Sequence, residues 1–196
     1  MKKGERTRQG IIETTAPLFN TRGFDGTSLS ILCEATGLTK GALYGNFLGK
    51  EDLYKASFQY AMSKVRACIR KEVDRCTTNK EKLLAVVDFF ARYVLDPPIK
   101  GGCPLLNTAI EADDHRKSMK KLVAVELELT ISFLTQLIEN GKKTGEFLKS
   151  IKSREVVLSV FCSIEGAIMF SRVSSSEEAM DVVVKNIKNQ ICSICI

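Results

Sequence analysis

The stretch TSLSILCEATGLTKGALYGNFLGKEDLY, residues 27–54, contains the pattern from which the fold of this chain is predicted. Apolar residues recur at helical spacing in its first part, which predicts a short helix over residues 27–35. Gly37 ends that helix, and Thr39 is placed to cap a second one over residues 39–47. Two short helices joined by a glycine-containing turn have the dimensions of a helix-turn-helix.

The second of these helices reads TKGALYGN and carries the side chains suited to meeting DNA. In a helix-turn-helix, this helix presents its N-terminal residues to the major groove. Lys40 supplies positive charge, while Tyr44 and Asn46 can donate hydrogen bonds to phosphates or base edges. Two small residues, Gly41 and Ala42, allow the backbone to approach the groove closely.

Leu43 and Phe47 lie four positions apart and are predicted to face the core of the same small module. Thr27, Thr39 and Lys50 lie at or beside predicted helix N-termini, and Thr27 can cap the first of the two helices. Free backbone N–H groups and the helix dipole favour a phosphate at such places. These three residues are therefore predicted phosphate contacts.

Helical periodicity continues on both sides of the motif. A first helix is predicted over residues 3–22, with a bend expected at Pro17, and Gly23 ends it. Further helices are predicted over residues 50–76, 80–96, 104–112, 115–141, 153–172 and 177–194. Convincing strand alternation is absent, so we predict an all-α protein with a three-helix helix-turn-helix domain over residues 1–49. A larger helical domain would follow over residues 50–196.

Composition and charge narrow the class of protein further. Of the 196 residues, 44% are hydrophobic and 27% charged, which is typical of a soluble globular protein. The apolar runs are too short to predict a membrane span, and the N-terminus lacks a secretory pattern, so we expect a cytoplasmic protein. Residues 1–50 hold seven basic and four acidic side chains, which is half of the net charge of +6. The seven cysteines are interpreted as reduced thiols.

The stretch 27–54 is similar to the DNA-binding signature of the tetracycline-repressor (TetR) family of bacterial regulators. Residues 11–24 resemble the first helix of that family. The resemblance implies that the recognition helix contains Lys40, Gly41, Ala42 and Tyr44. It also implies that Tyr44 and Lys50 contact phosphates, and that Thr27 matches a phosphate-contacting cap. This chain departs from the family where Gly45 follows the tyrosine, since members often have an aromatic residue or histidine there.

In that family, the helices after the DNA-binding module form a dimerising, ligand-binding domain, and ligand binding changes the spacing of the two modules. The resemblance implies a homodimer whose interface is a four-helix bundle built from the last two helices. From the residues alone, these apolar helix faces can be buried within the protomer or against a twofold mate. The expected function is a repressor that a small organic effector releases from a near-palindromic operator on double-stranded DNA.

Several side chains of the larger domain are candidates for an effector cavity. Met62, Phe89, Phe90, Tyr93 and Phe133 can line an apolar cavity, although ordinary core packing explains each of them as well.

The segment GGCPLLNTAIEADD, which begins at Gly101, resembles a GC-x-x-x-N-x-x-x-E pattern found in one subset of the family. Cys103 in this pattern is the candidate sensor if the signal is an electrophile or oxidant, with an inert thiol as the alternative. Glu111, the last residue of the pattern, is a further candidate to face the effector cavity.

Sequence patterns that would indicate other classes of function are weaker than the helix-turn-helix pattern. A thiol-based redox protein is the main alternative, since Cys192 and Cys195 have CxxC spacing, and a structural helical adaptor is another. Asp113, Asp114 and His115 could bind a metal, but helix capping is the simpler role without a second histidine. Familiar catalytic motifs are missing, so we expect neither an enzyme nor a cofactor or metal site.

Overall fold

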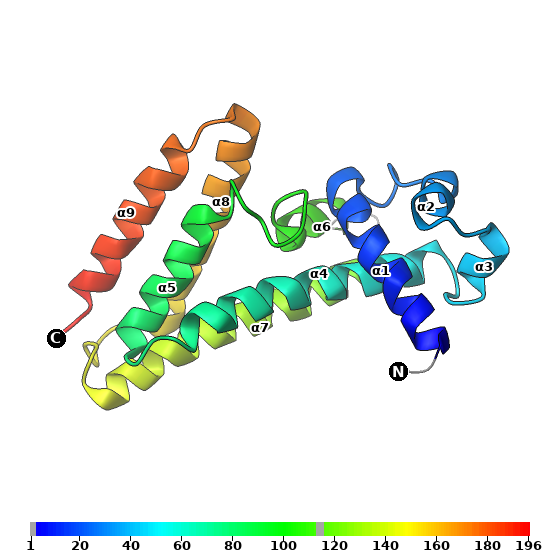
Figure 1. Ribbon diagram of the computed structural model, residues 1–196. Coiled ribbons are helices and arrows are strands. Elements are labelled where there is room, and N and C mark those ends of the chain that lie inside the picture. Colours follow the sequence, from blue (N-terminus) through cyan, green and yellow to red (C-terminus); the bar gives the residue numbers. More distant parts are fainter. Residues whose placement is uncertain (1–2, 113–115) are drawn as a thin grey trace. The chain divides into compact units, whose positions relative to one another are not determined.

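The computed structural model describes residues 3–112 and 116–196, which are helical apart from their connections and one isolated β-bridge (Figure 1). The described helices are α1 (Lys3–Arg22), α2 (Leu29–Thr36), α3 (Lys40–Tyr44), α4 (Lys50–Val73), α5 (Asn79–Arg92), α6 (Pro104–Ala112), α7 (Lys117–Thr144), α8 (Ser153–Ser174) and α9 (Glu178–Ser193). The predicted all-α class is confirmed. The roles considered for Asp113, Asp114 and His115 fall outside the described residues.

The chain forms two compact units. Unit 1 contains Met1–Val65 and Pro98–Val123, and unit 2 contains Arg66–Pro97 and Ala124–Ile196. Helices α4 and α7 therefore contribute residues to both units, whereas α6 belongs wholly to unit 1 with the helix-turn-helix. The functional boundary expected after residue 49 stays a prediction, because these units are defined by packing.

Helix α1 forms the centre of unit 1 and packs against both α2 and α6. It runs without a break through Pro17, as predicted, and buries one apolar face. That face consists of Ile11, Ile12, Ala16 and Phe19. Gly23 ends the helix with a φ of +70°, a left-handed conformation that glycine adopts without strain.

Local hydrogen bonds fix the ends of the helix-turn-helix. Gly37 ends α2 in the left-handed conformation, with a φ of +67°. The Thr39 hydroxyl accepts a hydrogen bond from the Ala42 N–H at 3.2 Å and caps α3, as predicted. Helix α3 ends at Tyr44, earlier than the predicted residue 47, and the chain continues through hydrogen-bonded turns to Phe47.

The prediction that Thr27 caps α2 is wrong. Its side chain is fully buried, and its hydroxyl donates to the Gly23 carbonyl oxygen at 2.6 Å. The cap is the next residue, Ser28, whose hydroxyl accepts from the Ile31 N–H at 3.3 Å. Two adjacent hydroxyl residues both satisfy the sequence preference for an N-cap, and packing against the rest of unit 1 decides between them.

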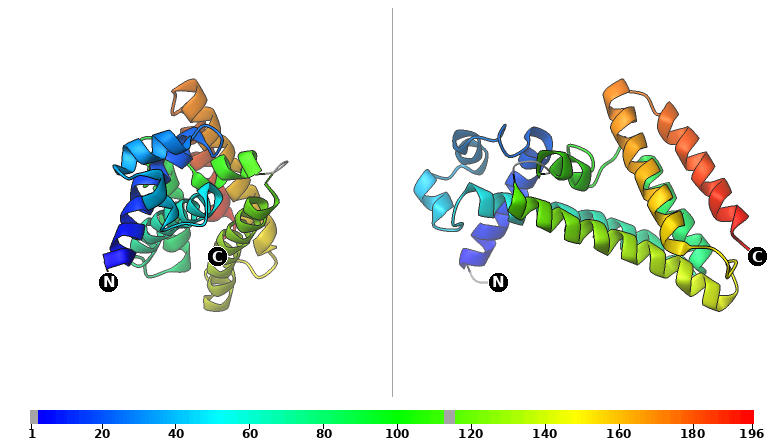
Figure 2. Two further views of the ribbon diagram at one scale, coloured as in Figure 1. Left: turned by 90° about the vertical axis from the view of Figure 1, so that its right-hand side faces the viewer. Right: turned by 180° about the vertical axis from the view of Figure 1, so that it is seen from behind.

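The C-terminal helices α8 and α9 contribute a large share of the core of unit 2. Helix α9 packs against α8 and α5, and α8 and α9 run antiparallel (Figures 1 and 2). The predicted apolar face of α9 is buried within the protomer through Ile187, Ile191 and Ile194. Helix α5 contributes buried side chains to the same unit, namely Leu83, Val86, Val87, Phe89 and Phe90.

The chain end is tied to the connection between α7 and α8. Phe147 and Cys195 form the isolated antiparallel bridge, and the Leu148 N–H donates to the Ile194 carbonyl oxygen at 3.0 Å. The Cys195 thiol donates to the Ile191 carbonyl oxygen, while Cys192 is exposed. The seven cysteines all lie in the described part of the chain and form no disulfide, and within the CxxC motif Cys195 has a structural role.

A methyl group added at Gly141 is expected to destabilise unit 2. Its Cβ would lie 2.2 Å from a ring carbon of Phe147, which is fully buried, so the substitution Gly141→Ala overpacks the core. Overpacking typically costs about 1–3 kcal/mol in the free energy of unfolding. Gly10→Ala is the matched control, because that helical position is open and alanine gains roughly 0.5–1 kcal/mol there. Thermal and urea unfolding of the two variants measure the difference, and equal stability would contradict the packing at Gly141.

Helix α8 departs from the expectation that no segment could span a membrane. With 22 residues and a mean hydropathy of 1.7 in its most apolar window, it is long and apolar enough to do so by length and composition. The core helix of a soluble protein passes the same test. One third of that window is buried inside the protomer, so an exposed apolar face remains.

Candidate DNA-binding interface

Helix α3 presents the predicted recognition residues to solvent. Lys40, Gly41 and Ala42 are exposed, and the Tyr44 side chain is 42% exposed. Leu43 is buried on the opposite side of the same helix, so the predicted division into an outward and an inward face is confirmed. The outward face offers one cationic side chain, one phenol and closely approachable backbone.

The predicted inward role of Phe47 is also confirmed, since this residue is only 4% exposed. The guanidinium carbon of Arg8 lies 4.6 Å above the centre of its ring, a cation–π contact that keeps a positive charge at the module's surface. Asn46 is half-buried, and its side-chain amide donates to the Ala42 carbonyl oxygen at 2.9 Å. This hydrogen bond closes the C-terminal end of α3, which is a structural role that the sequence did not indicate.

Ser28 is the exposed cap of α2, which the sequence reasoning missed. It is exposed at the N-terminus of α2, and its hydroxyl lies 2.7 Å from that of Ser30. The free N–H groups of this helix end therefore lie beside Ser28 rather than beside the buried Thr27. A sequence signal was present, since serine is as favoured at an N-cap as threonine.

Lys50 begins α4 and is held over an aromatic ring. Its ammonium nitrogen lies 4.1 Å from the centre of the Phe24 ring, and Arg116 contacts the same ring at 3.9 Å. Burial holds the pKa of Lys50 below its usual value, while the nearby Asp25 carboxylate opposes that shift. The predicted phosphate contact is thus a lysine whose position is restrained before any DNA is bound.

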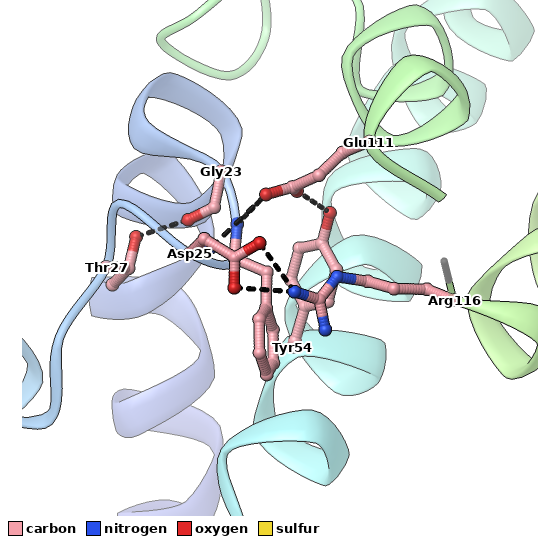
Figure 3. A network of polar contacts seen from close by, with 7 residues as sticks. Gly23, Asp25, Thr27, Tyr54, Glu111 and Arg116 are labelled. Atoms are coloured by element: carbon pink, nitrogen blue, oxygen red, sulfur yellow. Dashed lines mark hydrogen bonds and ion pairs between the residues drawn. The ribbon is translucent and has the colours of Figure 1, made fainter. Parts of the chain in front are cut away.

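Glu111 lies in unit 1 and binds the turn that leads into α2 (Figure 3). One carboxylate oxygen accepts from the Phe24 N–H at 2.6 Å and from the Asp25 N–H at 3.2 Å. The other oxygen accepts from the Tyr54 hydroxyl at 2.7 Å. Burial, followed by this hydrogen bond, raises the pKa of Tyr54. The hypothesis that Glu111 faces an effector cavity gains no support from these contacts.

The residues proposed for an effector cavity fall in both units. Met62 and Cys103 are buried in unit 1, whereas Phe133 is 41% exposed on α7. The aromatic residues Phe89, Phe90 and Tyr93 are buried in unit 2 and contact one another, with ring centres 5.0–5.5 Å apart. Cys103 is only 5% exposed, which is the setting of an inert thiol more than of a reactive one.

A small apolar cavity does occur in unit 2, between α5, α7, α8 and α9. Of the residues proposed from the sequence, only Phe90 lines it. The lining is aliphatic or aromatic throughout: Leu83, Val86, Val87, Phe90, Leu134, Ile138, Val156, Val157, Val160, Phe161, Ile164 and Ile191. Its volume is about 30 Å³, room for a water-sized probe, so a larger ligand requires the helices to move apart.

Within residues 3–112 and 116–196, no group of three His, Cys, Asp or Glu side chains is placed to hold a metal ion. The exposed side of α8 instead carries several large apolar side chains, called here the apolar stripe of α8. Leu158, Met169, Phe170 and Val173 are 40–84% exposed, and the exposed Gly166 lies between them. Exposed large apolar side chains on one helix are typical of an interaction surface.

Known families match both parts of the chain. The model described as bacterial regulatory proteins, tetR family, matches residues 11–57, which contain the helix-turn-helix. The model described as the tetracyclin repressor-like C-terminal domain matches residues 79–187, more than half of the chain. The second match extends the likeness beyond the DNA-binding signature, where the sequence alone showed only a similar layout.

Similar proteins agree with these matches. A solved TetR-family transcriptional regulator from Cytophaga hutchinsonii is 37% identical, with a TM-score of 0.94 over 100% of this chain and 98% of its own. The HTH-type transcriptional repressor ComR of Escherichia coli is 26% identical over 88% of this chain and 83% of its own length. The fold of the TetR-family regulator CifR, solved with 26-bp operator DNA, matches with a TM-score of 0.81 at 16% identity, covering 92% and 94% of the chains. This chain belongs to the TetR family of transcriptional regulators.

Proposed function

We propose that the protein is a cytoplasmic repressor that binds a near-palindromic operator as a homodimer and is released by a small organic effector. The main support for this proposal is the exposed face of α3. This helix belongs to a helix-turn-helix in which side chains cap both α2 and α3. Family membership supports DNA binding, and ComR, a relative described as a repressor, supports the direction of regulation.

The proposed division of labour on DNA follows from charge and exposure. Lys40 and Tyr44 extend from the exposed face of α3, where Gly41 and Ala42 leave the backbone free to approach base edges. Thr39 and Lys50 lie at the starts of α3 and α4, where the helix dipole favours a phosphate. Phosphate contacts position the recognition helix, and the contacts in the major groove read the sequence.

The exposed apolar stripe of α8 is the proposed dimer interface. A twofold axis brings the same stripe of two copies together, so small residues such as Gly166 allow the helices to approach closely. Two copies of α3 placed about 34–36 Å apart would enter successive major grooves on one side of the DNA. Burial against a second copy also accounts for the apolar character of α8 without a membrane.

Effector control requires a ligand that prefers one spacing of the two DNA-binding modules over the other. The apolar cavity of unit 2 supports this part of the proposal, because it is lined by four helices and is small enough that ligand entry must displace them. A ligand with equal affinity for both arrangements would leave DNA binding unchanged.

Replacing Tyr44 with alanine is expected to lower operator affinity at least tenfold without changing the fold. A hydrogen bond to a charged group contributes about 1.5–3 kcal/mol, and the dimer would lose two of them. The side chain is 42% exposed, so its removal leaves the core intact. Fluorescence anisotropy on operator DNA measures the affinity, and circular dichroism checks helical content. Tyr60→Ala, at a half-buried tyrosine of α4, is the matched control, and equal operator affinity of the two variants would contradict the assignment.

A further inference from the structure

Helix α6 presents two polar side chains, Asn107 and Glu111, one helical turn apart, to the end of α1. The Asn107 amide donates to the carbonyl oxygens of Asn20 at 3.0 Å and Gly101 at 2.9 Å. In return, the Asn20 amide donates to the carbonyl oxygen of Gly102 at 3.0 Å. Helix α6 is therefore hydrogen-bonded to the last turn of α1, more than eighty residues earlier in the chain.

One turn later, the Glu111 carboxylate binds the backbone of the connection between α1 and α2. It accepts from two successive N–H groups, those of Phe24 and Asp25, and from the Tyr54 hydroxyl of α4 (Figure 3). A carboxylate that accepts backbone N–H bonds makes charge-assisted hydrogen bonds, which are about twice as strong as neutral ones. A single side chain thus joins α6, α4 and the turn that leads into the helix-turn-helix.

Two glycines make this contact possible. A Cβ at Gly23 would lie 2.5 Å from the Glu111 carboxylate, and a Cβ at Gly101 would lie 2.7 Å from the Asn20 carbonyl oxygen. Both glycines also have positive φ values, of +70° and +114°. The close approach of α6 to the end of α1 is therefore specified by the backbone as well as by the polar side chains.

An ion pair reinforces the same turn. The Arg116 guanidinium donates to both carboxylate oxygens of Asp25, at 2.5 and 2.6 Å, and also covers the Phe24 ring (Figure 3). Lys50 contacts that ring as well, at 4.1 Å. Glu111 thus holds the backbone of the turn before α2, and Arg116 holds the Asp25 side chain of the same turn.

The path of the chain indicates that this contact does more than stabilise unit 1. Residues 98–123 belong to unit 1, although the segments before and after them belong to unit 2. We propose that Glu111 is a positioning residue for DNA binding: it touches no DNA, but fixes the α1–α2 turn and thereby the orientation of α2 and α3. This inference rests on the proposed DNA-binding function and deepens it.

The short recognition helix explains why such a residue is needed. Helix α3 has five residues, too few to be stable alone, so its orientation is imposed by its neighbours. Specific contacts with base edges need a recognition surface held to within about 0.5 Å of its productive position. Non-specific binding depends on charge alone and tolerates a less precise orientation.

The test compares specific with non-specific binding in the full-length dimer. The substitution Glu111→Ala is expected to lower affinity for operator DNA at least tenfold, while affinity for a duplex without the operator stays within twofold of wild type. If the substitution instead unfolded the whole helix-turn-helix, affinity for operator DNA and affinity for the duplex without the operator would both fall. Ile110→Ala is the matched control, because this neighbour on α6 is 67% exposed, and we expect wild-type affinities for it.

Two further variants separate the hydrogen bonds from the charge and from folding. Glu111→Gln keeps an oxygen for the two N–H groups and an amide that can donate to the Tyr54 hydroxyl, so it should restore operator affinity to within threefold of wild type. Tyr54→Phe removes one of the three hydrogen bonds and is expected to lower operator affinity about threefold. Its effect should vanish in the Glu111→Ala background, because the shared contact is already gone.

The outcomes separate this inference from the function on which it rests. Operator affinity of Glu111→Ala within twofold of wild type would overturn the positioning role, while a large loss in Tyr44→Ala would leave DNA binding established. If Glu111→Ala loses helical content, the operator affinity of the folded Tyr54→Phe variant becomes the test. Wild-type operator affinity in Tyr54→Phe would then overturn the positioning role of Glu111. A wild-type protein that binds no DNA sequence preferentially would instead refute the proposed function.

Discussion

Replacing Phe170 with glutamate should dissociate the dimer and lower operator affinity at least 100-fold. Phe170 is 56% exposed on the apolar stripe of α8, beside Met169 and Val173. Burying such a side chain contributes about 1.5–3 kcal/mol, and a twofold interface loses this contribution twice. The substitution also places two like charges in a desolvated interface, which adds to the cost.

Sedimentation velocity measures the state of assembly of Phe170→Glu, and an operator titration measures its affinity. Leu95→Glu is the control, because that leucine is 70% exposed on the connection after α5, outside the α8 stripe. We expect this control to remain a dimer with wild-type affinity. A Phe170→Glu variant that stays dimeric at micromolar concentration would show that the α8 stripe is not the interface.

Replacing Leu43 with alanine should destabilise the DNA-binding module by about 2–5 kcal/mol, the usual cost of removing a buried leucine side chain. Leu43 is 2% exposed and is the buried side chain of the five-residue helix α3. Local unfolding of α2 and α3 should become more frequent, and operator affinity should fall in proportion to the fraction of molecules in which the module is unfolded.

Hydrogen exchange of the α2 and α3 amides measures this local effect directly. Leu48→Ala provides a control within the same module, because this leucine is fully exposed and should change stability by less than about 0.5 kcal/mol. Equal exchange rates in the two variants would contradict the packing of α3 on Leu43.

The helix-turn-helix could be predicted from sequence because its signals are local. Gly37 and Thr39 each end or begin a helix through hydrogen bonds made within a few residues, and both act in the structure as predicted. The inward position of Leu43 follows from periodicity within one helix. The choice between Thr27 and Ser28 as the cap of α2 failed because it depends on packing with Gly23 and α1.

The role of Glu111 was beyond sequence reasoning for a different reason. Its partners are two backbone N–H groups at Phe24 and Asp25, and a backbone donor has no residue-specific signature. The separation of 86–87 positions also removes any periodic signal. The sequence pattern with Cys103 suggested that Glu111 could face an effector cavity, which stays a hypothesis, and it gave no sign of the contacts with the α1–α2 turn.

Of the aromatic residues singled out from the sequence, only Phe90 lines the apolar cavity of unit 2. The lining consists mainly of Leu, Val and Ile residues from four helices, which the sequence presents as ordinary core positions. Phe89 and Tyr93 are buried through mutual ring contacts, and Phe133 lies at the surface. A cavity is a property of packing between helices, and periodicity within each helix does not reveal where packing is incomplete.

Selection of randomised duplex DNA by the purified dimer is the most direct test of sequence-specific DNA binding. A repressor dimer should enrich an inverted repeat whose half-sites are separated by about one helical turn, 10–10.5 bp. Affinity for that site should fall steeply as salt rises. If the reduced, ligand-free protein enriches no sequence, while retaining its helical content and dimeric state, the proposed repressor function is contradicted.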